Sequence, residues 1–95
     1  MKLLGRESLY DFFKKHAEAR AQIESWIAEV DGAQWNSSSE LKSRYPSASV
    51  IDSQHVIFNI CRNKYRLWVM VSYKNRIVFI KKIGTHKEYD KWTIG

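Results

Sequence analysis

Residues 55–82 read HVIFNICRNKYRLWVMVSYKNRIVFIKK, and this stretch decides the fold. It alternates apolar and polar side chains and is rich in β-branched and aromatic residues, a pattern typical of half-buried strands. It divides into three runs, at residues 55–61, 64–73 and 76–82. Asn63 and Asn75 lie in the short junctions, where asparagine tolerates the left-handed backbone of tight turns. We therefore expect an antiparallel meander of three strands, to which residues 1–4 and 50–51 could add edges.

The apolar spacing upstream of the meander changes from two to three or four residues, which favours helices. The apolar positions are Leu9, Phe12, Phe13 and His16, then Ile23, Trp26, Ile27 and Val30. We expect two successive helices that bend near residues 16–21, the second ending near Asp31 with Gly32 as its left-handed C′ residue.

A third, short helix is expected near residues 37–44. Ser37 and Glu40 have the spacing of a capping box, and Pro46 forbids further helix. The predicted fold class is therefore α+β: two N-terminal helices packed on an antiparallel sheet of three to four strands, as one domain over residues 1–95. We assign Trp26 and Trp35 to the core.

The helices can cover only one face of such a sheet, which leaves the other face free. On the middle strand Arg66 alternates with Leu67, so Arg66 should lie on the free face. A lone cysteine, Cys61, indicates a reducing compartment. No apolar stretch approaches the ~20 residues that span a bilayer, so we expect a cytoplasmic protein without a membrane partner.

The net charge of +6 is concentrated near the C-terminus. Residues 61–95 hold nine Lys or Arg against two acidic residues, whereas residues 1–60 hold seven against eight. A local positive surplus favours a polyanionic partner, whose bases could stack on nearby aromatic rings, namely Tyr65, Trp68, Tyr73 and Tyr89. The alternative is a solvated sheet whose lysines protect its edges from aggregation.

Residues 81–91, KKIGTHKEYDK, gather Lys, His, Glu, Tyr and Asp side chains, which can transfer protons, in one short loop after the third strand. The alternative is a structural turn of helix, in which Thr85 and Glu88 form a capping box and Tyr89 packs on the sheet. The His and Cys residues lack the spacing of a metal site, and the scattered glycines form no phosphate-binding loop, so we expect neither a metal nor another cofactor.

Two segments, NKYRL at residues 63–67 and GTHKEYD at residues 84–90, together resemble the HigB toxins of type II toxin–antitoxin modules, in the RelE-like superfamily. The resemblance extends over nearly the whole chain, although Arg62 stands where relatives often have glycine. It implies an endoribonuclease that attacks mRNA, typically on translating ribosomes. It also implies a helix-turn-helix antitoxin, HigA-like, as partner.

Cleavage of RNA without a metal needs a base for the 2′-hydroxyl, an acid for the leaving 5′-oxygen and cations for the phosphate. Given the resemblance, Arg66 is expected to hold the scissile phosphate, unless it only pairs with Glu88 or Asp90. His86 is expected to shuttle protons as acid or base, or else to hold the loop together. Tyr89 is expected to stack on substrate or act as an acid, unless it is a core residue.

The remaining expected site residues support these three. The RNA-binding set is Lys64, Lys87, Arg62, Asn63 and Lys82, and the supporting set is Thr85, Glu88 and Asp90. The composition also allows two other functions, a basic RNA-binding module without catalysis and a domain whose basic face docks an acidic protein.

Overall fold

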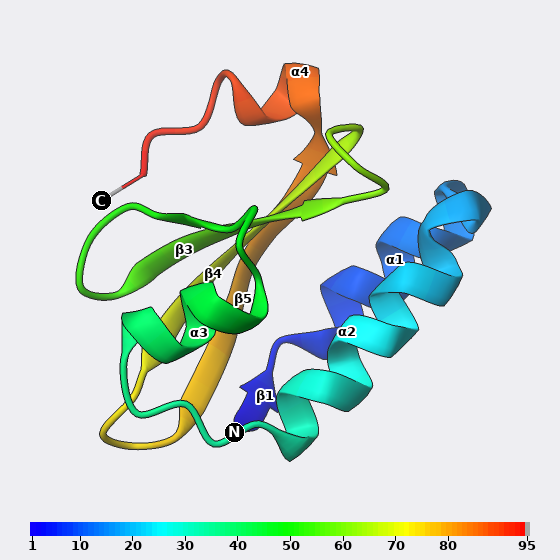
Figure 1. Cartoon of the computed structure of the whole chain (residues 1–95). Coiled ribbons are helices and arrows are strands. Elements are labelled where there is room, and N and C mark those ends of the chain that lie inside the picture. The colour runs from blue at the N-terminus through cyan, green and yellow to red at the C-terminus, as the bar shows by residue number, and fades with distance from the viewer. Residues whose placement is uncertain (95) are drawn as a thin grey trace.

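The fold is a two-layer α+β arrangement, seen in a computed structural model that describes residues 1–94 (Figure 1). The strands are β1 (Lys2–Leu4), β2 (Ser49–Val50), β3 (His55–Ile60), β4 (Tyr65–Ser72) and β5 (Ile77–Thr85). The helices are α1 (Arg6–Lys15), α2 (Arg20–Gly32), α3 (Ser38–Arg44) and α4 (His86–Tyr89), with a 3₁₀ turn, η1 (Ala17–Ala19), between α1 and α2. The predicted α+β class is confirmed.

The sheet has the order β1-β5-β4-β3-β2. The meander β3-β4-β5 is antiparallel, as predicted, but β1 pairs with β5 in parallel. The expectation of three to four antiparallel strands is therefore wrong, because the sheet has five strands and is mixed. Gly5 follows β1: its backbone is left-handed (φ 88°), and an added Cβ would lie 3.2 Å from Ile80. This close turn sends the chain directly from β1 into α1.

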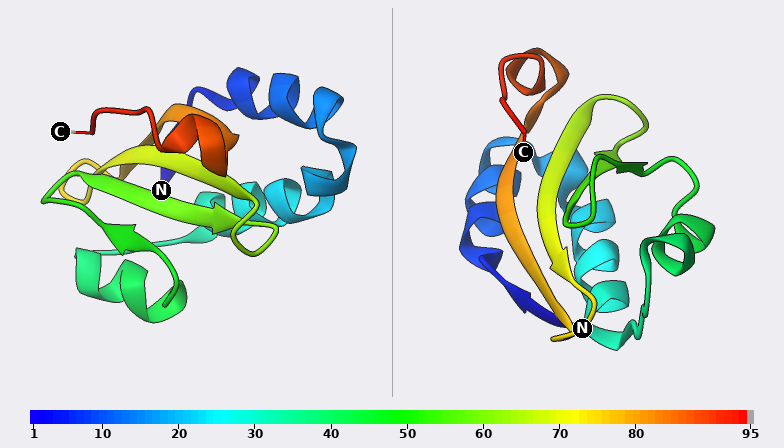
Figure 2. Two further views of the ribbon diagram at one scale, coloured as in Figure 1. Left: turned by 90° about the horizontal axis from the view of Figure 1, so that it is seen from above. Right: turned by 90° about the vertical axis from the view of Figure 1, so that its left-hand side faces the viewer.

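Helices α1 and α2 pack on one face of the sheet, as the two views in Figure 2 show. The core joins Leu9 of α1 and the apolar stripe of α2 to the inward residues of β3, β4 and β5. Trp26 and Trp35 are both buried, as predicted. Gly32 is the last residue of α2, and Ala33 after it is extended, so the predicted left-handed C′ glycine is wrong.

Helix α3 confirms Ser37 as the N-cap residue, but the predicted capping box is only half formed, because the Glu40 carboxylate bonds the Asn36 N–H and not the Ser37 N–H. The Ser37 hydroxyl accepts a hydrogen bond from the Glu40 N–H at 3.3 Å, and the Glu40 carboxylate accepts one from the Asn36 N–H at 3.1 Å. The helix ends at Arg44, two residues before Pro46, as that proline requires.

The two hairpin turns differ from the prediction in one respect. The left-handed residues are Cys61 and Arg62 in the first turn and Arg76 in the second, rather than Asn63 and Asn75. Both hairpins form because β3 pairs with β4 and β4 pairs with β5. The register of each pair fixes which residue of the connecting turn must adopt a positive φ. Arg62 thus adopts a backbone conformation that glycine favours.

Candidate active site

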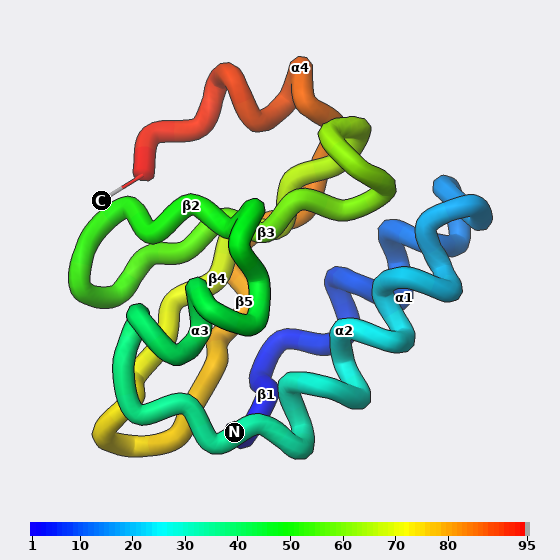
Figure 3. The backbone as a smooth tube through the Cα atoms, in the orientation of Figure 1, coloured from blue at the N-terminus to red at the C-terminus, as the bar shows by residue number. Residues whose placement is uncertain are grey.

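The two motif segments meet at one end of the sheet. The chain trace in Figure 3 shows the turn of residues 61–64 and α4 at the same end. Tyr65 of β4 pairs with Thr85 of β5, and Arg66 pairs with Gly84. The His86 N–H donates to the Lys64 carbonyl at 3.2 Å. Residues twenty positions apart in sequence therefore form one surface.

Arg66 lies on the sheet face opposite the helices and is half-buried. Its Nη1 donates to the Asn63 carbonyl at 2.7 Å, and its guanidinium carbon lies 5.4 Å from the centre of the Tyr89 ring. Among the described residues it forms no ion pair with Glu88 or Asp90, the pairing that the sequence left open as an alternative. A guanidinium has five N–H donors, so several remain for an anion.

Helix α4 begins with the capping box that the sequence offered as an alternative to a catalytic loop. The Thr85 hydroxyl accepts from the Glu88 N–H at 3.2 Å, and the Glu88 carboxylate accepts from the Thr85 N–H at 2.9 Å. That backbone hydrogen bond lowers the pKa of Glu88. The loop expected at residues 81–91 is thus wrong: β5 continues to Thr85 and a capped turn of helix follows.

His86 and Asp90 lie one helical turn apart on α4. The His86 Nδ1 lies 3.4 Å from an Asp90 carboxylate oxygen, and both side chains are about half exposed, at 53% and 60%. The His86 ring meets the Tyr89 ring edge-on at 6.2 Å. An imidazole placed in this way is accessible to a substrate and has a carboxylate beside it to orient it.

A row of packed aromatic rings, Tyr89, Trp92 and Trp68, extends over the free sheet face. Trp92 lies 5.7 Å from Tyr89 and 6.1 Å from Trp68, measured between ring centres, and Trp68 Nε1 donates to His55 Nδ1 at 2.9 Å. Trp92 was not among the predicted site residues. No local sequence signal marks it, because the fold alone brings its ring to Gly84, where an added Cβ would lie 3.1 Å away.

Two of the rings expected to stack on bases are not available for it. Tyr65 is 1% exposed and belongs to the core, and Trp68 is 7% exposed. Register explains Tyr65, because it shares the inward face with Leu67. Tyr89 and Trp92 are the partly exposed rings beside Arg66 and His86.

The expected RNA-binding residues surround this surface on two sides. Arg62, Asn63 and Lys87 are exposed. Lys64 is turned towards Glu18 of η1, with 3.1 Å between the ammonium and the carboxylate. Lys82 lines a cleft of about 500 Å³ between α1 and the end of β5.

Glu18 accepts hydrogen bonds from Tyr65 and Lys64, and the Tyr65 hydroxyl contributes most to lowering its pKa to about 2 from the ordinary 4.5. Because the pKa is lower in the folded chain, ionised Glu18 stabilises the fold above about pH 4.5, and this contribution is lost as the pH falls towards 2.

This pKa shift predicts how the stability of a Glu18 variant changes with pH. When the pH is lowered from about 4.5 towards 2, the free energy of unfolding of Glu18→Gln should fall by less than that of the wild type, as measured by urea titrations at each pH. Glu24→Gln, which removes an exposed carboxylate paired with Arg20, should keep the wild-type slope. Equal slopes for Glu18→Gln and the wild type would contradict the assignment.

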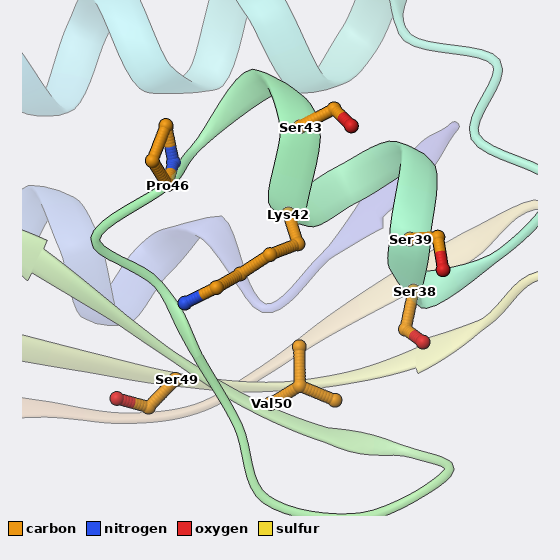
Figure 4. A pocket seen from close by; sticks show the side chains of 7 residues that line it. All are labelled: Ser38, Ser39, Lys42, Ser43, Pro46, Ser49 and Val50. Atoms are coloured by element: carbon orange, nitrogen blue, oxygen red, sulfur yellow. The ribbon is translucent and has the colours of Figure 1, made fainter.

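A separate hollow of about 780 Å³ lies between α3 and β2 (Figure 4). Serines and Val50 line most of it, and the Lys42 ammonium donates to the Ala48 carbonyl. The residues lining this hollow therefore offer no equivalent of Arg66 and His86, the cation and the proton-transfer group beside α4. Within residues 1–94 we find neither a helix capable of crossing a membrane nor three potential ligand side chains grouped for a metal ion.

The chain is similar over most of its length to known proteins. Residues 19–92 match the HigB_toxin family, described as the RelE-like toxic component of a toxin–antitoxin system. The chain is 25% identical to the mRNA interferase toxin HigB of Escherichia coli (strain K12), over 98% of this chain and 91% of that protein. Proteins called mRNA interferase HigB from Escherichia coli O157:H7 and Shigella flexneri match with the same identity and coverage.

Proposed function

This chain belongs to the HigB family of RelE-like toxins, and from that premise we propose that it is an endoribonuclease that cleaves messenger RNA and so inhibits translation. The observation that carries the proposal is the meeting of Arg66, His86 and Tyr89 at one end of the free sheet face. These residues supply a fixed cation, a proton-transfer group and an aromatic ring in one place. RNA cleavage at a phosphodiester needs the first two.

In the proposed reaction, the ribose 2′-oxygen attacks the adjacent phosphorus. The 2′-hydroxyl loses its proton, a bond forms between the 2′-oxygen and phosphorus, the bond from phosphorus to the 5′-oxygen breaks, and that oxygen gains a proton. Arg66 binds the non-bridging oxygens, where negative charge grows. His86 performs one of the two proton transfers, with Asp90 orienting its imidazole. Since protein groups supply these needs, the proposal includes no metal or other cofactor.

Tyr89 has two proposed tasks, which its contacts support. Its ring packs against the Arg66 guanidinium, so it limits where that side chain can point. Its other neighbours are His86 and Trp92, and a base placed beside the scissile phosphate could stack on this pair of aromatic rings.

The surrounding polar and basic side chains give the RNA backbone a path across the site. The cations Arg62 and Lys87 and the neutral amide of Asn63 are exposed beside the reactive groups, and Lys82 extends the positive surface to the cleft along α1. Lys64 can join them only by leaving Glu18, and an exposed ion pair of this kind is worth little. Thr85 and Glu88 act through the capping box that sets the direction of α4.

Three further elements of the proposal follow from family membership. The partner is an antitoxin, which we propose to be a HigA-like helix-turn-helix protein that neutralises the toxin. The substrate is mRNA engaged with the ribosome. The protein acts in the cytoplasm, where its single cysteine stays reduced.

A translation extract tests the function. Protein purified free of antitoxin is added to an extract that translates a reporter mRNA, and we expect synthesis to stop and primer extension to reveal new 5′ ends within the message. The competing reading, a basic module that binds RNA without cutting it, predicts salt-sensitive binding and an intact message. Continued synthesis with intact mRNA would refute the ribonuclease.

A further inference from the structure

We propose that Glu18 and Gln22, at the bend between α1 and α2, are positioning residues for Arg66 and His86, acting through the turn of residues 61–64. The inference rests on the proposed function for its kinetic consequence but not for its structural one. In Figure 1 the bend and the turn lie at the same end of the molecule. Neither Glu18 nor Gln22 contacts Arg66 or His86 in any hydrogen bond of the described structure.

The turn supplies one backbone carbonyl to each reactive residue. The Asn63 carbonyl accepts from the Arg66 guanidinium at 2.7 Å, and the Lys64 carbonyl accepts from the His86 N–H at 3.2 Å. The first bond helps to set the direction of a long, flexible side chain, and the second fixes the start of α4. A displacement of the turn would therefore move both groups relative to each other.

Residues of the bend between α1 and α2 hydrogen-bond to both sides of the turn of residues 61–64. Gln22 accepts from the Cys61 N–H at 2.7 Å on the β3 side. On the β4 side Glu18 accepts from the Tyr65 hydroxyl and from the Lys64 ammonium. Cys61 and Arg62 adopt the left-handed backbone conformation, which residues other than glycine rarely adopt. This conformation therefore depends on surrounding contacts, such as the hydrogen bonds to Gln22 and Glu18.

Burial identifies the contact that matters most. Lys64 and Glu18 are 61% and 50% exposed, so water competes with their ion pair. Tyr65 is 1% exposed, its ring packs edge-on against Phe12 at 5.0 Å, and its hydroxyl lies 3.3 Å from His16 Nδ1. A buried hydroxyl needs a hydrogen-bond partner. A neutral acceptor at position 18 would keep this hydroxyl paired, through a weaker hydrogen bond than the carboxylate makes.

Four variants separate the hydrogen bond of Tyr65 from the ion pair of Lys64. Glu18→Ala removes the carboxylate acceptor and leaves His16 Nδ1 as the neighbour of the Tyr65 hydroxyl, Tyr65→Phe removes the donor, and Glu18→Gln keeps an acceptor at position 18 without the charge. Glu24→Ala is the matched control, because Glu24 is also an exposed glutamate near the start of α2, and its partner is Arg20. A role in positioning predicts loss in the first two variants and rescue in the third.

Amide hydrogen exchange on the full-length protein measures the structural consequence without any assay of activity. In Glu18→Ala and Tyr65→Phe we expect the His86 amide to exchange at least ~10-fold faster than in the wild type, while the core amide of Val69 is unchanged. Glu18→Gln and Glu24→Ala should keep the wild-type His86 rate. An unchanged His86 rate in both Glu18→Ala and Tyr65→Phe would overturn the proposal, whatever the protein cleaves.

The kinetic readout separates positioning from RNA binding. We expect Glu18→Ala to lower kcat for mRNA cleavage by ~10-fold or more and to leave KM within about twofold, since a small misplacement acts on the transition state. A rise in KM with unchanged kcat would instead mean that position 18 affects RNA binding through Lys64, and would overturn the positioning role.

Discussion

Replacing Arg66 with alanine is expected to lower the rate of mRNA cleavage by about 10²–10³-fold, the usual cost of losing one preorganised group that stabilises charge in a transition state. Arg66 is suited to this task because its guanidinium is half-buried, packs on Tyr89 and has no acidic partner among the described residues. Its contact with the Asn63 carbonyl leaves other N–H groups for phosphate. The loss should appear in kcat, measured in the translation extract by the rate at which full-length message disappears.

Two further arginine variants make the Arg66 prediction specific. Arg76→Ala removes the same charge from an exposed residue at the opposite end of the β4–β5 hairpin, where Arg76 donates to Asn36, and should keep near wild-type activity. Arg66→Lys should remain strongly impaired, because an ammonium lacks the two-pronged geometry of a guanidinium. Equal losses in Arg66→Ala and Arg76→Ala would show that only overall charge matters.

Replacing His86 with alanine is expected to cost about 10²–10⁴-fold in kcat, the range for removal of a general acid or base. The variant should fold, since His86 is exposed and the capping box of α4 belongs to Thr85 and Glu88. Asp90→Asn should cost less, on the order of 10-fold, because Asp90 only orients the imidazole. Single-turnover cleavage rates, with circular dichroism to check folding, measure both.

The relative losses of kcat in His86→Ala and Asp90→Asn distinguish the roles of these two residues. If Asp90→Asn costs as much as His86→Ala, Asp90 has a direct role and the assignment of proton transfer to His86 is wrong. If His86→Ala cleaves at the wild-type rate while keeping its fold, His86 is a structural residue of α4. Both outcomes would leave the test of Arg66 intact, since Arg66 lies on β4 and not on α4.

Local patterns predicted the elements that depend on local chemistry. Alternation identified β3, β4 and β5, three- and four-residue spacing identified α1 and α2, and side-chain spacing identified the N-cap residues of α3 and α4. The placement of Arg66 on the face away from Leu67 also followed from strand geometry alone. Each of these features is determined by residues within a few positions of one another.

The errors concern features that depend on distant partners. The direction of β1 is set by β5, about 75 residues away. Tyr65 could have stacked on a base, but strand register and the packing of Phe12 and Glu18 place it in the core. Trp92 lies beyond every sequence motif, and its place over Gly84 depends on where α4 directs the chain.

The same limit applies to the candidate site. The sequence identified Arg66, His86 and Tyr89 as types of residue suited to RNA cleavage, but their meeting depends on the pairing of β4 with β5. It gave no reason to look at Glu18 or Gln22, because their link to the turn of residues 61–64 spans about 40 positions. A role of this kind can be recognised only when the hydrogen bonds are traced in three dimensions.

The central claim is that this protein cleaves mRNA by attack of the ribose 2′-hydroxyl at a site built from Arg66 and His86. The most direct test is mass spectrometry of the fragment ends recovered from the translation extract. We predict a 2′,3′-cyclic phosphate on the upstream fragment and a 5′-hydroxyl on the downstream fragment with the wild type, and about 10²–10³-fold slower formation of both with Arg66→Ala. A 3′-hydroxyl and a 5′-phosphate at the cut, or equal rates of fragment formation with both proteins, would contradict the account.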